Sequence, residues 1–68
     1  MKIINCTGNK AHVQYQGKHY LISDNGSETL IFPSNSTGRI TNYAEVGGAK
    51  SVTLREVIEN FNSYLYNF

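Results

Sequence analysis

The chain has 68 residues, a length that allows one domain, residues 1–68. Six Lys and Arg against five Asp and Glu leave a formal charge of +1, which excludes a strongly basic nucleic-acid binder and an acidic DNA mimic. The single cysteine excludes an internal disulfide framework and a four-cysteine zinc site. No apolar run has the roughly 18 residues of a membrane helix, and no basic region precedes an apolar signal segment.

The small size of the chain predicts association. Below about 70–80 residues, a single core seldom supplies more than about 3–5 kcal/mol of stability. With no disulfide and no evident metal site, we expect a homodimer or a tightly bound partner. Five Tyr and three Phe fit this expectation, because aromatic side chains fill a thin core and also suit interfaces.

The first half of the chain reads as strands and turns. Residues 1–6 form a short apolar stretch that ends at a turn signal in residues 7–10. Residues 11–23 predict a β-hairpin whose two-residue loop is Gln16-Gly17. The opposed pairs are then Tyr15 and Lys18, Val13 and Tyr20, and Ala11 and Ile22. Because opposed residues share a face, one face carries Ala11, Val13, Tyr15, Tyr20 and Ile22, and the other carries His12, Gln14, His19 and Leu21.

A second turn, at residues 24–27, leads into a strand over Glu28–Phe32. Its Asn25-Gly26 pair is the strongest short hairpin signal. If this pair is the two-residue loop, Ile22 lies opposite Thr29 and Tyr20 lies opposite Ile31. Leu30 and Phe32 then join Leu21 on the opposite face. A change of one residue in the loop would exchange the two faces, and the sequence leaves this register open.

Beyond this strand the pattern predicts a loop, one more strand and a break. Pro33 ends the strand or marks its edge, and residues 34–38 are a polar loop. A further strand is predicted over Arg39–Ala44, with Ile40 and Tyr43. Gly47-Gly48 reads as a flexible break before the C-terminal helix.

The C-terminal segment predicts an amphipathic helix over about residues 54–66. Thr53 and Glu56 have the spacing of a capping box at its start. Apolar residues recur at helical spacing on one face: Leu54, Val57, Ile58, Phe61, Tyr64 and Leu65. The sequence therefore predicts a small α+β fold, an antiparallel β-meander of about four strands over residues 2–46, covered by one C-terminal helix.

Residues that could carry chemistry are few. His12, His19 and Cys6 are the only soft metal ligands, and the hairpin register puts the two histidines diagonally on one face. Structural zinc prefers four ligands, so we interpret them as two half-exposed strand histidines and a small core cysteine, with no metal and no cofactor. Cys6 with a histidine is also the only candidate nucleophile and base.

Catalysis is not expected. Glu56 and Glu59 lie on the solvent side of the helix, and a domain of this size has little room for a cleft of roughly 300 Å³. Residues 46–51 do not have the spacing of a phosphate-binding loop. For nucleic acid, the six basic residues are spread evenly along the chain, so binding would depend on Tyr15, Tyr20, Lys10 and Lys18.

A helix on one side of an antiparallel sheet leaves the other face open. On the predicted register that face gathers Leu21, Leu30 and Phe32 beside His12 and His19. An apolar patch of this kind usually marks an interface. We therefore expect these five residues to bind a partner protein or a second copy of the chain.

One stretch of the chain carries a family resemblance. Glu28-Thr29-Leu30-Ile31-Phe32-Pro33 is followed by Gly38-Arg39-Ile40-Thr41, Tyr43, Glu45-Val46 and Gly47-Gly48. This pattern, about a third of the chain, resembles small, mostly uncharacterised phage-encoded proteins. The resemblance implies a phage accessory protein in the cytoplasm of a bacterial host. Many such proteins bind and block a host protein, anti-CRISPR proteins among them.

Three functions are compatible with the sequence. The first is a non-catalytic protein-binding module that occupies a surface of a host protein such as a defence nuclease. The second is a small nucleic-acid-binding or regulatory protein. The third is a self-associating structural module of a virion. No membrane partner is expected.

Overall fold

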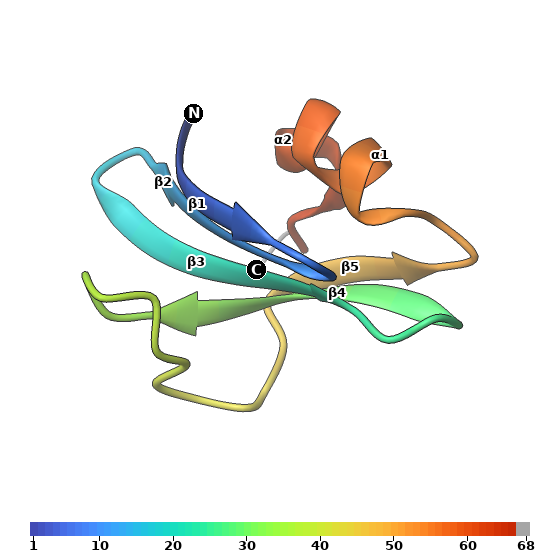
Figure 1. Cartoon of the computed structure of the whole chain (residues 1–68), viewed down its shortest axis with the longest axis horizontal. Coiled ribbons are helices and arrows are strands. Elements are labelled where there is room, and N and C mark those ends of the chain that lie inside the picture. Colours follow the sequence, from blue (N-terminus) through green and yellow to red (C-terminus); the bar gives the residue numbers. More distant parts are fainter. Residues whose placement is uncertain (67–68) are drawn as a thin grey trace.

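The computed structural model describes residues 1–66 of the chain. Five strands form one antiparallel sheet in the order β1-β2-β3-β4-β5, and two short helices follow it (Figure 1). The strands are β1 (Lys2–Thr7), β2 (Lys10–Tyr15), β3 (Lys18–Asp24), β4 (Glu28–Ser34) and β5 (Gly47–Lys50), and the helices are α1 (Leu54–Glu59) and α2 (Phe61–Tyr64). The α+β class and the meander are confirmed, with one strand and one helix more than expected.

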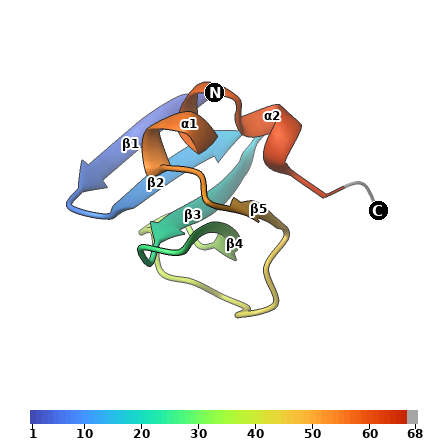
Figure 2. The same cartoon turned by 90° about the vertical axis from the view of Figure 1, so that its right-hand side faces the viewer.

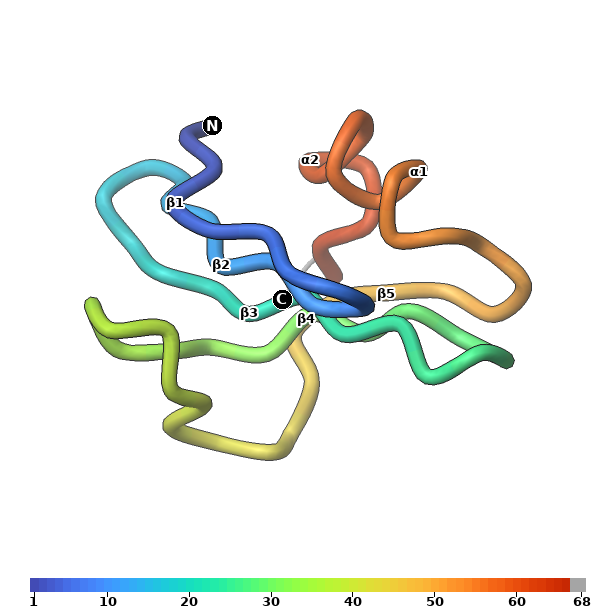
Figure 3. Tube along the Cα trace, in the orientation of Figure 1, coloured from blue at the N-terminus to red at the C-terminus, as the bar shows by residue number. Residues whose placement is uncertain are grey.

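The two faces of the sheet are covered differently. Both helices lie over one face, which we call the helix face, as Figures 1 and 2 show. The connection from β4 to β5, residues 35–46, swings out on the opposite side, the loop face, and its path is clearest in Figure 3. The core lies on the helix face and, within residues 1–66, consists of six buried apolar residues: Ala11, Val13, Ile22, Ile31, Val57 and Phe61.

The hairpin of β2 and β3 has the predicted register, with Tyr15 opposite Lys18 and Val13 opposite Tyr20. Gln16 and Gly17 both have positive φ, at 51° and 78°. That conformation matches the right-handed twist of the flanking strands, so a two-residue loop closes the hairpin without splaying them. The local turn therefore determines which side chains reach the core.

The next hairpin differs from the predicted register. Ile22 lies opposite Ile31, two residues beyond the expected Thr29. The side chain of Asn25 explains the longer loop, because its Oδ1 accepts hydrogen bonds from the backbone N–H groups of Ser27 and Glu28, at 3.1 and 3.0 Å. Since side chains alternate with a period of two, a shift of two residues leaves every side chain on its predicted face.

The predicted strand over Arg39–Ala44 is wrong. Only Ile40 forms a bridge, with Ser34, and the chain leaves the edge of β4 at residues 42–45 before it returns. The Asn35 side chain disturbs strand formation here, because its Oδ1 accepts from the backbone N–H of Arg39 at 3.0 Å. The strand that pairs with β4 is instead β5, in the segment expected to be a flexible break.

Two glycines make β5 possible. A Cβ on Gly47 would collide with the carbonyl oxygen of Tyr64 and would lie 2.8 Å from Cδ1 of Ile31. Gly48 has φ +126°, and a Cβ there would collide with the carbonyl oxygen of Thr29. The glycine pair therefore allows close approach of three backbone segments, rather than acting as a hinge.

The helical segment begins as predicted but is interrupted. Thr53 is the N-cap, and its hydroxyl accepts from the backbone N–H of Glu56 at 3.1 Å. At Asn60 the backbone leaves helical geometry, with φ −127° and ψ 37°, so one helix over 54–66 is wrong. The break lets Leu65 form a bridge with Gly47 of β5. Neither helix among the described residues is long and apolar enough to cross a membrane.

Phe61 packs the C-terminal helical segment against the sheet, so Phe61→Ala should strongly destabilise the protein. The ring is 3% exposed and lies 5.2 and 5.3 Å from the rings of Tyr15 and Tyr20. Truncation of a buried aromatic costs about 3–5 kcal/mol, comparable with the whole stability of a small domain. Urea unfolding followed by circular dichroism measures the loss.

Glu59→Ala is the matched control on the same segment. Its ion pair with Arg55, at 3.2 Å, joins side chains that are 58% and 86% exposed. Such surface pairs contribute about 0–1 kcal/mol, so the unfolding midpoint should barely move. The opposite order of the two variants would contradict the assigned helix face.

Candidate functional site

The five predicted binding residues all lie on the loop face and adjoin one another. His12 on β2 lies opposite Leu21 on β3, and Leu21 lies opposite Phe32 on β4. His19 and Leu30 flank this row on β3 and β4. These five residues stay on one face in the observed register, because it differs from the predicted one by two residues and side chains alternate with a period of two. Leu21, Leu30, Phe32 and His19 are half-buried, whereas His12 is buried, at 7% exposure.

This face is not open as expected, because the 35–46 connection covers part of it. The Tyr43 ring folds back onto Phe32, with ring centroids 5.8 Å apart, yet Tyr43 remains 77% exposed. It is the most exposed large hydrophobic side chain among the described residues. The sequence placed Tyr43 in a strand and did not mark it as a site residue, since its contact depends on the path of the whole connection.

The first half of this connection is held by Asn35. Its Oδ1 accepts from the backbone N–H groups of Thr37 and Arg39, both at 3.0 Å, and its carbonyl accepts from Gly38 at 3.1 Å. This turn places Gly38 directly against the imidazole of His12. A Cβ on Gly38 would lie 2.9 Å from His12 Nδ1, so only glycine fits without displacement.

Beneath Gly38, the two histidines form a hydrogen-bonded pair. His12 Nε2 and His19 Nδ1 are 2.9 Å apart, and one of them donates while the other accepts. Burial, and then the positive charge that His19 acquires, lower the pKa of His12 below 6.5. The neutral form of His12 is therefore favoured.

The other soft ligand lies elsewhere. Cys6 is opposite Ala11, on the helix face, whereas the histidines lie on the loop face. The thiol and an imidazole therefore do not form a nucleophile–base pair in this structure. Cys6 is also exposed, so the interpretation as a core cysteine is wrong. Among residues 1–66, no three His, Cys, Asp or Glu side chains come together as metal ligands would.

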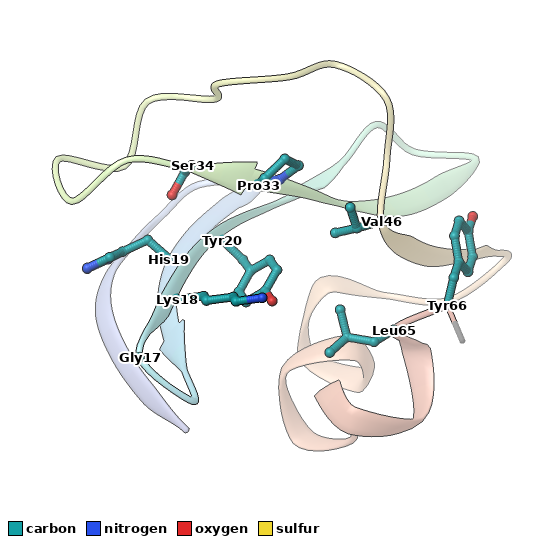
Figure 4. Close-up of a pocket in the computed structure, with 9 residues that line it drawn as sticks. All are labelled: Gly17, Lys18, His19, Tyr20, Pro33, Ser34, Val46, Leu65 and Tyr66. Atoms are coloured by element: carbon teal, nitrogen blue, oxygen red, sulfur yellow. The ribbon is translucent and has the colours of Figure 1, made fainter. Parts of the chain in front are cut away.

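The domain has more room for hollows than its size led us to expect, since little room for a cleft of roughly 300 Å³ was predicted. One hollow of about 600 Å³ lies between the β2–β3 turn, the end of β4 and the C-terminal segment. Figure 4 shows Tyr20, Val46, Leu65 and Tyr66 around it, with His19 pointing away. A second, of about 470 Å³, lies between β1 and the Asn35 turn. Among the described residues that line the two hollows, none is a carboxylate or a thiol.

The residues suggested for nucleic-acid binding are separated by the fold. The rings of Tyr15 and Tyr20 pack on Phe61, and the Tyr15 hydroxyl donates to Asn62 Oδ1 at 2.8 Å. Lys18 lies on the helix face, opposite Tyr15, while Lys10 lies on the loop face. These four side chains therefore do not form one basic and aromatic surface.

Comparison of the chain with protein-family models, with curated protein sequences and with solved structures found no match. The candidate site is thus described by its geometry alone: an apolar row on the loop face, partly covered by a connection that presents Tyr43.

Stability should fall as the pH drops below 6.5, because the unfolded chain binds a proton at His12 more readily than the folded protein does. Because the pKa of His12 is lower in the folded protein than in the unfolded chain, the contribution of His12 to the free energy of unfolding is fully present above the unfolded-state pKa of 6.5. It is progressively lost as the pH falls below that value. Urea unfolding at pH 7.5 and 5.5 measures the change, and an NMR titration of His12 should have its midpoint below 6.5. In His12→Gln this part of the pH dependence should disappear; an unchanged dependence would contradict the assignment.

Gly38→Ala should destabilise the protein more than Gly26→Ala. Both glycines have similar positive φ, +87° and +97°, so the backbone cost of about 1–2 kcal/mol is shared. Only at Gly38 does the added Cβ meet another residue, His12, whereas Gly26 has nothing within 4 Å. If Gly38→Ala and Gly26→Ala lose the same free energy of unfolding in urea, the connection does not contact His12 as closely as the structure shows.

Proposed function

We propose that this protein is a non-catalytic binding module that recognises another protein through the loop face. Its contact surface consists of Leu21, Leu30 and Phe32 together with Tyr43, and His19 lies at its border. His12 acts from beneath, by supporting Gly38 and the connection. We propose further that the partner is a bacterial host protein, such as a defence nuclease, whose surface the module occupies, as small phage accessory proteins do.

The exposed Tyr43 ring is the observation that carries this proposal. A tyrosine that is 77% exposed yet packed on a phenylalanine presents a large apolar face in a defined position. Tyrosine is enriched among the residues that dominate interface energetics, and its two side-chain torsions cost little entropy on binding. The backbone N–H of Thr41 donates to the carbonyl of Pro33 at 3.0 Å, and that of Ala44 donates to Asn42 Oδ1 at 2.9 Å. These bonds restrain the segment that carries Tyr43, which reduces the ordering cost further.

Charge on the loop face supports a partner surface that carries acidic residues. The register places three strand lysines on this face: Lys2, Lys10 and Lys50. Of the carboxylates on the strands, Glu28 is the one that lies on the same face. The apolar row lies between these lysines. Rim charges of this kind accelerate association and select the partner more than they raise affinity.

Affinity capture from host lysate, with the purified protein immobilised, tests the proposal. We expect a host protein to be retained after nuclease treatment, and its retention to depend on Tyr43. Tyr43→Ser should reduce capture at least tenfold, which corresponds to about 1.4 kcal/mol. Its melting temperature should stay nearly unchanged, because the side chain is mostly exposed.

Tyr66→Ser is the matched control, since Tyr66 is also exposed but lies at the C-terminal segment. It should capture the partner as well as the unmodified protein does. Recovery of nucleic acid alone, lost after nuclease treatment, would favour the nucleic-acid-binding alternative. Equal capture by Tyr43→Ser and the unmodified protein would exclude the loop face as the binding surface.

A further inference from the structure

Strand β1 forms an unpaired edge of the sheet. Within residues 1–66 it pairs with β2 alone, all six of its residues are exposed, and Figure 2 shows it as the outermost strand on its side. Apolar side chains concentrate here: among the described residues, Met1, Ile3 and Ile4 are three of the five exposed large hydrophobics. An edge of this kind is a template for another strand.

The opposite edge is partly occupied by the chain itself. Gly47, at the start of β5, forms a bridge with Leu65, and the backbone N–H of Tyr66 donates to the carbonyl of Val46 at 2.9 Å. The free edge at β1 is therefore the more accessible of the two.

The register shows which backbone groups of β1 point outward. In an antiparallel sheet, successive residues direct their N–H and C=O groups to alternate sides. The two-residue turn at Gln16-Gly17 directs Tyr15, Val13 and Ala11 toward β3, so Lys10, His12 and Gln14 face β1. Their partners on β1 are Thr7, Asn5 and Lys2. The groups of Ile3 and Cys6 are therefore the ones that point away from β2.

A β-bulge at Ile4 makes this arrangement self-complementary. The register shifts between Ile3 and Asn5, so Ile3 and Cys6, three residues apart, both lie on the helix face, opposite Val13 and Ala11. In a regular strand, residues three apart would lie on opposite faces. The bulge thus gives two outward-facing positions that share a face and are symmetric about the centre of β1.

We propose that two copies of the chain form a dimer by antiparallel pairing of their β1 strands, with Ile3 of each opposite Cys6 of the other. In this register Lys2 lies opposite Thr7 and Ile4 opposite Asn5, so no like charges oppose each other. Ile3 and Cys6 of both copies then form one apolar cluster on the helix face. The two sheets become one continuous sheet with five strands from each copy.

A second copy fits this edge better than a foreign strand because the edge matches itself. The interface is isologous, so the assembly closes at two copies and does not extend into a filament. It also covers Ile3 and Ile4 and so adds apolar burial to a domain whose described residues form a core of six buried apolar side chains. Tyr43 lies on the other side of the sheet and stays available, so this inference is independent of the proposed partner.

Disulfide trapping tests the register directly. Directly opposed residues in an antiparallel pair have Cα atoms about 5.5 Å apart, which suits a disulfide. Ile3→Cys should therefore form a covalent dimer with the native Cys6 of the second copy under mild oxidation, on a non-reducing gel. The unmodified protein and Ile4→Cys should form little, because Cys6 then has no thiol opposite it. Equal trapping in all three proteins, or none in Ile3→Cys, would overturn the proposal.

Light scattering on the unmodified protein gives a second measurement that needs no cysteine. We expect a dimer mass for the unmodified protein and a monomer mass for Ile3→Lys, whose exposed position should leave the circular dichroism spectrum unchanged. Tyr43→Ser should remain a dimer. A monomer mass for the unmodified protein at millimolar concentration would overturn the proposal, as would a dimer that Tyr43→Ser disrupts and Ile3→Lys does not.

Discussion

The contact of the Phe61 ring with Tyr15 and Tyr20 connects the sheet to the C-terminal helices, and the arrangement of the helix face depends on it. In the part of the chain that the structure describes, one short sheet and two short helices bury six apolar residues, and Phe61 is the largest of them. Its position requires the chain to turn at Asn60 and to pass Leu65 beside Gly47. That passage is possible only because Gly47 has no side chain, so the C-terminal helices and β5 depend on each other.

Asparagine side chains shape the loops on which the candidate site depends. Asn25 and Asn35 each accept backbone hydrogen bonds from the next few residues. Asn25 makes the β3–β4 turn longer than the two-residue loop that Asn25-Gly26 predicts, and Asn35 closes the turn after β4. The Asn35 turn brings Gly38 onto His12 and starts the connection that returns with Tyr43 over Phe32. The loop face therefore owes its form to local polar contacts, whereas the helix face owes its form to apolar packing.

The loop face and the β1 edge lie on different parts of the sheet and suit different kinds of partner. The loop face offers an aromatic side chain with cationic residues around it, which suits recognition of a foreign surface. The β1 edge offers backbone donors and acceptors with a symmetric apolar pattern, which suits a second copy of the same chain. A dimer would present two loop faces at once and so raise the avidity for a partner that displays two sites.

Much of the site could be read from sequence because it depends on alternation along strands. The Gln16-Gly17 turn and the period of two assigned His12, His19 and Leu21 to one face, and Leu30 and Phe32 stayed with them because the error in the second register was even. The helix cap at Thr53 and the burial of Phe61 could also be predicted, because each follows from the spacing of residues within a few turns of the chain. Sequence reasoning missed Tyr43, the exposed Cys6 and the burial of His12, because each depends on how distant segments meet.

The sequence by itself determined the hairpin, its two faces and the start of the helix, since turn chemistry and side-chain periodicity act over a few residues. Tertiary structure alone decided that Gly47-Gly48 forms a strand, because the cost of a side chain there comes from Tyr64 and Thr29, far away in the chain. It also decided the path of residues 35–46 and the break at Asn60. These features follow from steric limits between segments that meet only in the folded protein, and no local pattern encodes such limits.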